Sequence, residues 1–299
     1  HRGVRILSLL PSATEIVYAL GLEEELVGVT HECDWPPAAR SRRQVSFSAL
    51  PPAASPGEVD RLVSATVNGG EPIYHLDTEA VGELRPELVL TQDLCAVCAV
   101  PSGHVNAALE VLGCRAEVLS MDPSSLDGVL ACVLEVGAAT GAHVRAAELV
   151  DSLRARLDTV AARVAGRDRP RTFALEWSDP PFNAGHWVPE MIELAGGEPV
   201  LASRGTPSVR VGWEQVASAA PEVVVFMPCG YDLEAASSEA RGLLDRAELA
   251  GVTRLFAVDA SSYFSRPGPR LVDGVEILAS ALHGDAVPQN APGVLRRIR

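Results

Sequence analysis

Short apolar runs alternate with helix-type segments along almost the whole chain, and this alternation limits the possible folds more than any other feature. Each run is short, strongly apolar and followed by a turn or a loop, as expected for strands that are buried on both faces. Strands that alternate with helices predict parallel sheets covered by helices. The predicted strands are residues 5–10, 26–30, 88–91, 117–119, 172–177, 223–227 and 255–259.

One stretch, residues 142–166, contains no proline and no internal glycine, which predicts a single long helix. At 1.5 Å per residue it would span about 37 Å, enough to connect two lobes. The sequence therefore predicts an α/β fold of two Rossmann-like lobes with parallel sheets, joined by one long α-helix, with a ligand cleft between the lobes. The predicted parts are an N-terminal lobe (1–141), the connecting helix (142–166) and a C-terminal lobe (167–299).

Two segments on either side of the long helix share a pattern. Residues 79–90 and residues 214–225 each start with a glutamate, pass through a valine and a proline, and end in an apolar run. Each pattern is typical of a helix, a proline stop and a buried strand. The repeat predicts that the two lobes are equivalent.

Local signals predict several element boundaries. Ser12 and Glu15 have the spacing of a capping box, which predicts the N-terminus of a helix that ends at Gly21. Asp77 predicts the start of another short helix. A closing helix is expected over residues 269–283, and the tail after it, rich in proline and arginine, is expected to be frayed.

The charge and composition of the chain exclude several classes of protein. The formal net charge is −14, and all 25 basic residues are arginines, so a nucleic acid partner is not expected. The lack of lysine excludes both a phosphate-binding-loop lysine and a Schiff-base lysine. No Gly-x-Ser-x-Gly elbow and no His-Glu-x-x-His helix occurs, so we expect a binding protein and not an enzyme.

The loops that follow the apolar runs contain a large share of the aromatic side chains. Ligands of parallel sheets gather beyond the carboxyl ends of the strands, so aromatic residues there indicate a wide, flat ligand. The alternative is that several of them cap the ends of the sheets as core residues. The candidate ligand-binding residues are Pro11, Ser12, Trp35, Gln92, Leu94, Phe182, Trp187, Tyr263, Phe264 and Arg266.

Four soft metal ligands occur in two of these loops, namely His31, Cys33, Cys95 and Cys98. Together they have the donor atoms of a zinc site, but a single Cys-x-x-Cys is a weak signal for one. Inert thiols or a disulfide are the preferred interpretation. We therefore expect no required cofactor and no metal centre, and keep the four residues as candidates.

Glu79 and Glu214 occupy equivalent places in the repeat, in the first turns of their predicted helices. The helix dipole favours acidic residues there whatever the function. One carboxylate on each of two lobes would also suit a partner with two-fold symmetry that carries arginines, such as a transporter dimer.

The chain resembles the helical-backbone (class III) substrate-binding proteins of ABC importers, and among them the vitamin B12 (cobalamin)-binding family. The resemblance covers nearly the whole chain. The matching segments are residues 5–15, 27–29, 34–37, 180–182 with Gly185, 196–198, 214–216 and 263–270.

This resemblance implies a role for particular residues. Trp35, Phe182, Tyr263 and Arg266 match positions that line a corrinoid cleft, and Glu79 and Glu214 match the carboxylates that dock on the permease. Gln92 and Ser262 depart from the family pattern, and residues 47–75 include an insertion that would reshape one rim.

The expected function is therefore binding of cobalamin or cobinamide by a monomer that serves an ABC permease dimer, without insertion into a membrane. The alternatives are a siderophore- or haem-binding protein and a cytosolic cysteine- or metal-dependent enzyme or cofactor chaperone. The expected compartment is extracytoplasmic, periplasmic or lipid-anchored, if a signal has been trimmed. It is cytoplasmic if the chain natively starts here, since the first strand leaves no room for a signal.

Overall fold

The computed structural model describes residues 3–48, 56–68, 73–93, 102–113, 115–284 and 293–299. They form two compact units, His1–Pro123 with Leu130–Val150 and Ser124–Val129 with Asp151–Arg299. The long helix α6 (His143–Val164) contributes to both units, and α5 (Leu126–Thr140) precedes it. The predicted α/β fold of two lobes connected by one long helix is confirmed.

The first unit is built on a four-stranded sheet in the order β2-β1-β5-β6. Every pairing in it is parallel, and Ile6 lies opposite Leu26 on one side and Leu88 on the other. The parallel sheet predicted for this lobe is confirmed. Its strands are β1 (Ile6–Ser8), β2 (Leu26–Gly28), β5 (Leu88–Thr91) and β6 (Glu117–Ser120).

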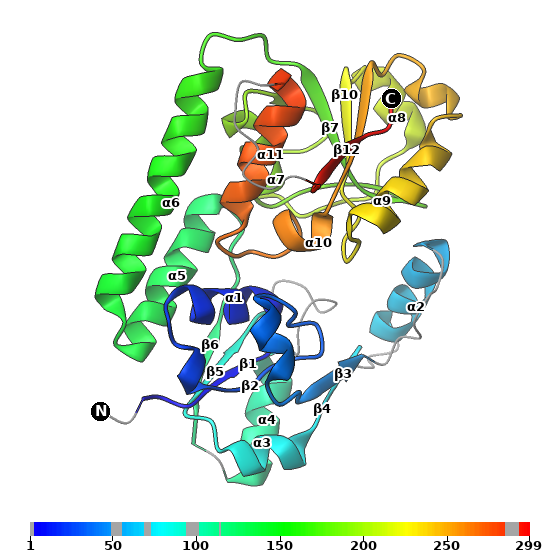
Figure 1. Cartoon of the computed structure of the whole chain (residues 1–299). Helices are drawn as coiled ribbons and strands as arrows, with labels where there is room; N and C mark the ends of the chain where they lie inside the picture. Colours follow the sequence, from blue (N-terminus) through cyan, green and yellow to red (C-terminus); the bar gives the residue numbers. More distant parts are fainter. Residues whose placement is uncertain (1–2, 49–55, 69–72, 94–101, 114, 285–292) are drawn as a thin grey trace. The chain divides into compact units, whose positions relative to one another are not determined.

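Helices cover both faces of this first sheet (Figure 1). α3 (Thr78–Leu84) and α4 (Ser102–Leu112) lie on one face, and α1 (Pro11–Ala19) lies on the other. The buried cluster under α3 and α4 consists of Leu7, Leu9, Val45, Ala80, Val81, Val89, Val105 and Leu109. Short 3₁₀ turns, η1 (Glu23–Glu25) and η2 (Pro37–Ser41), flank β2.

Between β2 and α3 the chain is not part of the four-stranded sheet. This segment contains the insertion predicted from the sequence. β3 (Ser46–Ser48) and β4 (Tyr74–Leu76) pair as a two-stranded antiparallel ribbon, and α2 (Pro56–Asn68) lies between them in the sequence. We call residues 46–76 the ribbon–helix excursion. Figure 1 shows α2 standing away from the four-stranded sheet of its own unit.

The second unit contains a sheet in the order β12-β11-β10-β7-β8, with β9 paired to β7. β7, β9, β10 and β11 pair in parallel, but β8 and β12 run antiparallel to their neighbours. The parallel pairing predicted for this lobe is found at the centre of the sheet, which is mixed at its edges. The two residues Asp179 and Pro180 fold β8 straight back on β7. The strands are β7 (Arg171–Ser178), β8 (Pro181–Asn183), β9 (Glu198–Pro199), β10 (Val223–Phe226), β11 (Arg254–Val258) and β12 (Leu295–Arg297).

The helices of the second unit sandwich its sheet, with α7 and α11 on one face and α8 and α9 on the other (Figure 1). The unit's helices and turns are α7 (Val188–Leu194), α8 (Trp213–Ala219), α9 (Leu233–Ala240), η3 (Arg241–Leu243), η4 (Ala247–Leu249), α10 (Ala260–Tyr263) and α11 (Leu271–His283).

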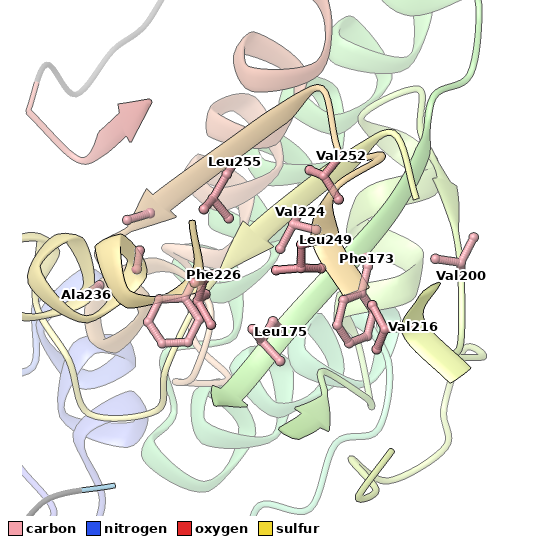
Figure 2. Close-up of a cluster of buried hydrophobic side chains, with 13 residues drawn as sticks. Phe173, Leu175, Val200, Val216, Val224, Phe226, Ala236, Leu249, Val252 and Leu255 are labelled. Carbon is pink, nitrogen blue, oxygen red and sulfur yellow. The ribbon is translucent and has the colours of Figure 1, made fainter. Parts of the chain in front are cut away.

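Alternate side chains of the central strands fill the core under α8 and α9. Phe173 and Leu175 of β7 pack beside Phe226 of β10, and none of the three has exposed surface (Figure 2). Side chains with this spacing share one face of a strand, so the apolar runs that predicted the strands also form the core.

The repeat seen in the sequence forms the same local structure in both units. In the first unit, the Arg5 N–H donates to the Glu87 carboxylate (3.0 Å), and α3 ends at Arg85 with a left-handed backbone before Pro86. In the second unit, the Arg171 N–H donates to Glu222 (2.9 Å), and α8 ends with a left-handed Ala220 before a proline. We call this arrangement the arginine–glutamate lock.

Helix α1 begins differently from the prediction. It starts at Pro11, the N-cap residue is Leu10, and no side chain caps it, so the predicted capping box of Ser12 and Glu15 is wrong. Proline fixes φ at a helical value and needs no hydrogen-bond acceptor, so Pro11 takes the first helical position and moves Ser12 inside the first turn.

The end of the chain is also more ordered than predicted. β12 pairs with β11, and the Arg299 guanidinium donates to the Leu249 carbonyl (2.8 Å) and the Leu244 carbonyl (2.7 Å). The prediction of a frayed tail is wrong for residues 293–299, because the exposed edge of β11 offers backbone partners to the last strand.

Among the described residues, every helix is too short or too polar to cross a membrane.

Candidate functional site

The loops beyond the carboxyl ends of the strands hold the candidate residues, and each unit is described separately. After β1, Pro11 and Ser12 are buried in the first turn of α1. None of the described residues hydrogen-bonds to the Ser12 hydroxyl. A buried hydroxyl without a partner is costly, so it marks a position where an additional group would be stabilising.

Cys33 is bound into a buried polar network of the first unit. The Thr14 hydroxyl is 3.1 Å from the Cys33 sulfur and 2.8 Å from the Ser8 hydroxyl, and the Thr30 hydroxyl is 3.2 Å from the sulfur. Cys33 forms no disulfide with another described residue, and 2% of its surface is exposed. It therefore fits the preferred interpretation of an inert thiol better than that of a metal ligand.

The loop after β2 is held by the ribbon–helix excursion. His31 Nδ1 is 3.1 Å from the Ser46 carbonyl oxygen, and the Tyr74 hydroxyl donates to the Glu32 carboxylate (3.2 Å). Trp35, in the same loop, has 46% of its surface exposed. A large exposed aromatic on a loop fixed at its base is suited to contact a ligand.

Asp93 and Asp122 tie together the loops that follow β5 and β6. The Ser102 hydroxyl (2.6 Å) and N–H (2.8 Å) donate to Asp93, and these hydrogen bonds lower the pKa of that carboxyl. The Asp93 N–H donates in turn to Asp122 (2.6 Å). Gln92, a candidate ligand residue, is buried beside them, with 4% of its surface exposed.

Three further candidates, Leu94, Cys95 and Cys98, lie outside the described residues, so their predicted roles stay predictions. In the part of the chain that the structure describes, no three His, Cys, Asp or Glu side chains are grouped so that they could hold a metal ion.

Aromatic side chains gather at the carboxyl edge of the second sheet. Trp177 and Phe182 are opposite one another in the β7–β8 pair, and the Trp177 ring meets the Tyr231 ring edge to face, with 5.8 Å between centroids. The Arg210 guanidinium lies over Phe182, 5.6 Å from its centroid. We call Trp177, Phe182, Tyr231 and Arg210 the aromatic edge.

Tyr231 and Arg210 were missed as candidates by the sequence reasoning. Tyr231 follows β10 in a short Pro-Cys-Gly loop, and this position beyond a strand end was the signal that could have found it. Arg210 gave no such signal, because only the fold brings its segment beside β8.

Trp187 and Phe264 belong to the interior of the second unit. They have 6% and 2% of their surface exposed, and the Trp187 indole N–H donates to the Phe264 carbonyl (2.8 Å). Their burial favours the alternative that some of the aromatic candidates cap the sheet end as core residues. Tyr263 and Arg266 are half-buried, and the Arg270 guanidinium lies 5.5 Å from the Tyr263 centroid.

Glu176 places a carboxyl group inside the second unit. It lies between Leu175 and Trp177, where the β7–β8 register shifts, and its Oε2 is buried without a hydrogen-bond partner. Burial raises the pKa of the Glu176 carboxyl to about 7, although a hydrogen bond from the Ser208 hydroxyl acts in the opposite direction. The Ser208 oxygen also accepts from the Gly185 N–H (3.0 Å).

Glu79 and Glu214 are exposed in the first turns of α3 and α8. They occupy equivalent positions in the two helices that lead into the arginine–glutamate locks. Glu214 lines a surface hollow with Leu201, Gln215, Ser218 and Ala219. Each unit therefore presents one carboxylate to solvent from the same element of its fold.

The chain is similar to known proteins over most of its length. The family model described as periplasmic binding protein matches residues 6–253. The uncharacterized ABC transporter substrate-binding lipoprotein YvrC of Bacillus subtilis (strain 168) is 26% identical over 293 residues, which cover 94% of this chain and 80% of that protein.

Two further similarities concern proteins with named ligands. The vitamin B12-binding protein of Yersinia pestis (strain Pestoides F) is 26% identical over 224 residues, covering 74% of this chain and 68% of that protein. The crystal structure of a periplasmic heme binding protein from Pseudomonas aeruginosa superimposes with a TM-score of 0.72 at 22% identity, covering 99% of this chain and 98% of that one.

Proposed function

This chain belongs to the periplasmic binding protein family, and from that premise we propose that its ligand is a corrinoid such as cobalamin or cobinamide. Proteins of this family are the substrate-binding components of ABC importers and not enzymes. The enzyme alternative is therefore set aside. In this proposal the corrinoid is cargo, and the chain needs no cofactor of its own.

The aromatic edge of the second unit is the observation that carries the proposal. Trp177, Phe182 and Tyr231 bring broad apolar faces to one strand end, which suits a ligand with a wide ring system. The guanidinium of Arg210 beside them offers donors for the amide and phosphate groups at a corrinoid's rim. A relative that is 26% identical to this chain over 224 residues is named a vitamin B12-binding protein.

Haem and ferric siderophores are the alternative ligands. Haem is also a wide, flat ring, and the superimposed Pseudomonas aeruginosa structure is of a heme binding protein. The two propionates of haem would also suit the arginines near the aromatic faces. Titration with each class of ligand separates the alternatives, because their visible absorption spectra differ.

We expect calorimetric titration with cobinamide or cobalamin to give a dissociation constant well below 100 μM, and ferric haem and a ferric siderophore to bind at least tenfold more weakly. Phe182→Ala should weaken corrinoid binding about tenfold, because it removes one aromatic face and the support of Arg210. Val144→Ala, at a side chain with 71% of its surface exposed on α6, is the control and should leave the affinity unchanged. No corrinoid binding below about 100 μM would contradict the proposal.

We further propose that Glu79 and Glu214 dock the protein on arginines of its permease. The double variant Glu79→Arg/Glu214→Arg should abolish association with the reconstituted permease, since each new charge would repel the partner's arginines. Its affinity for the corrinoid should stay within about twofold of the wild type.

Charge reversal at Glu148, an exposed residue of α6, is the matched control and should leave the association unaffected. Normal permease binding by the Glu79→Arg/Glu214→Arg variant would show that these glutamates only stabilise the helices in which they lie.

The proposed compartment is extracytoplasmic, and the proposed solution state is a monomer. The relative from Bacillus subtilis is named a lipoprotein, and the family is one of periplasmic binding proteins. Cell fractionation of the natural gene product tests the compartment, and recovery in the cytosol would favour a cofactor chaperone instead.

A further inference from the structure

Glu176 is an extra residue in the ladder between β7 and β8. Leu175 lies opposite Asn183 and Trp177 lies opposite Phe182, so two steps along β7 match one step along β8. A bulge of this kind redirects the side chain of the extra residue, and bulges are frequent next to functional sites. Glu176 directly precedes Trp177, so this bulge adjoins the aromatic edge of the second unit.

The carboxyl group of Glu176 has one hydrogen-bond partner among the described residues, the Ser208 hydroxyl. Its Oε2 is buried and bonds to none of them. Burying a charged oxygen without a partner is costly, and this cost raises the pKa of the Glu176 carboxyl to about 7. The group therefore changes its charge near neutral pH, unlike an ordinary surface glutamate.

Ser208 links this carboxyl to the segment that carries Arg210. The Ser208 oxygen accepts from the Gly185 N–H (3.0 Å), which ties the segment to the chain just after β8. Two residues further on, Arg210 forms an antiparallel bridge with Phe182, and its guanidinium lies over the Phe182 ring. Glu176 therefore adjoins the aromatic edge in two ways, along β7 and through the Ser208 hydroxyl.

No charged side chain balances the Glu176 carboxyl in the part of the chain that the structure describes. Burial and the Ser208 hydroxyl set its pKa, and no described charged residue contributes. The charged or titratable side chains on the surrounding elements have other partners. His186 lies against Trp187, Arg210 over Phe182, Tyr231 and Ser178 beside Glu239, and Arg270 over Tyr263. An ionised Glu176 would therefore be an uncompensated charge next to the aromatic edge.

A purely structural role at this position does not require a carboxyl group. A glutamine would accept the same hydrogen bond from the Ser208 hydroxyl and would never bury a negative charge. Groups that reduce stability in this way, with a pKa displaced toward neutral pH, are typical of functional sites. The carboxyl of Glu176 therefore indicates a role for its proton.

We propose that Glu176 is a positioning residue of the aromatic edge, and that only its neutral, protonated form supports tight ligand binding. The inference rests on the proposed function and adds to it a coupling between binding and proton uptake. Glu176 as a whole residue keeps some exposed surface, and a ligand seated on Trp177 and Phe182 would exclude water from it. Loss of this water disfavours the carboxylate further, so the ligand prefers the protein with neutral Glu176.

The pKa of Glu176 in the ligand-free protein sets the pH range of the effect. Below about pH 7 the carboxyl is mostly neutral, and the affinity for the ligand has its full value. Above about pH 7 a growing share of the protein must first take up a proton. The affinity then falls by up to about tenfold per pH unit, until the higher pKa of the complex is reached.

Titration with cyanocobalamin, which has no group that ionises between pH 6 and pH 8.5, tests this coupling. The dissociation constant of the wild-type protein should be about tenfold larger at pH 8.5 than at pH 6. For Glu176→Gln it should change by less than about twofold, because glutamine accepts from Ser208 and never ionises. Asp245→Asn, at an exposed carboxylate of the same unit, is the matched control and should keep the wild-type change.

A second measurement needs no variant. Calorimetry at pH 7.5 in two buffers with different ionisation enthalpies counts the protons exchanged on binding, and the wild-type protein should take up about half a proton per cyanocobalamin. A dissociation constant that is independent of pH, binding without proton uptake, or a folded Glu176→Gln protein that keeps the tenfold change would overturn the inference and leave corrinoid binding standing. Failure of the wild-type protein to bind any corrinoid at pH 6 would overturn the proposed function itself, and this inference with it.

Discussion

Replacing Glu176 by glutamine is expected to stabilise the protein by about 3 kcal/mol at pH 8 and by less than about 1 kcal/mol at pH 5. The folded-state pKa of Glu176 is raised to about 7 by burial, from an ordinary value of 4.5. The stability that its proton provides is therefore fully present below pH 4.5 and is lost as the pH rises through about 7. Glutamine keeps an acceptor for the Ser208 hydroxyl and never ionises.

Urea denaturation at the two pH values measures this effect. Glu110→Gln, at an exposed residue of α4, is the matched control and should change the free energy of unfolding by less than about 0.5 kcal/mol at either pH. A Glu176→Gln protein that gains the same stability at pH 5 and pH 8 would show that folding does not raise the pKa of Glu176 above its ordinary value.

Arg156→Ala is expected to lower the free energy of unfolding by about 2 kcal/mol. Arg156, on α6, binds the carboxylates of Glu276 (2.8 and 3.0 Å) and Asp273, both on α11. These contacts raise the pKa of Arg156, and the hydrogen bonds to Glu276 have the largest effect. The Glu276 side chain is only 11% exposed, so without the arginine a mostly buried carboxylate would lose the guanidinium that it binds. One third of the Arg156 side chain is exposed, which reduces the effect below that of a fully buried pair.

A matched control lies on the same helix. Arg154 is 3.8 Å from Asp127, and both side chains are more than half exposed, so Arg154→Ala should cost less than about 0.5 kcal/mol. Adding Glu276→Gln to Arg156→Ala should recover part of the loss, because it removes the buried negative charge that Arg156 had balanced. Equal stabilities of the Arg154→Ala and Arg156→Ala proteins would contradict the assignment of a buried charge at Glu276.

The strands of the first sheet, and β7, β10 and β11 of the second, could be predicted because burial on both faces demands continuous apolar runs. Leu88–Thr91 and Val223–Phe226 are examples whose sequence alone is unambiguous. α6 was predictable from the absence of proline and glycine. β12 was not, because Leu295–Arg297 has two arginines and becomes a strand only through pairing with the edge of β11.

The sequence predicted which loops hold the candidate residues better than it predicted which of those residues are exposed. The loop position of Trp35 and of Phe182 followed from the strands before them, and both residues keep exposed surface. Burial of Trp187 and Phe264 could not be foreseen, because it depends on the packing of α7 and the loop after α10. Nor could the restraint of His31, which comes from a ribbon that the sequence showed only as an insertion.

The arginine–glutamate lock also gives matching landmarks in the two halves of the chain. Arg5 and Pro86 are 81 positions apart, whereas Arg171 and Pro221 are 50 apart, so the first half is longer by 31 residues between equivalent landmarks. The ribbon–helix excursion, residues 46–76, has that same length. The ribbon–helix excursion therefore accounts in length for the whole difference between the two halves over these landmarks.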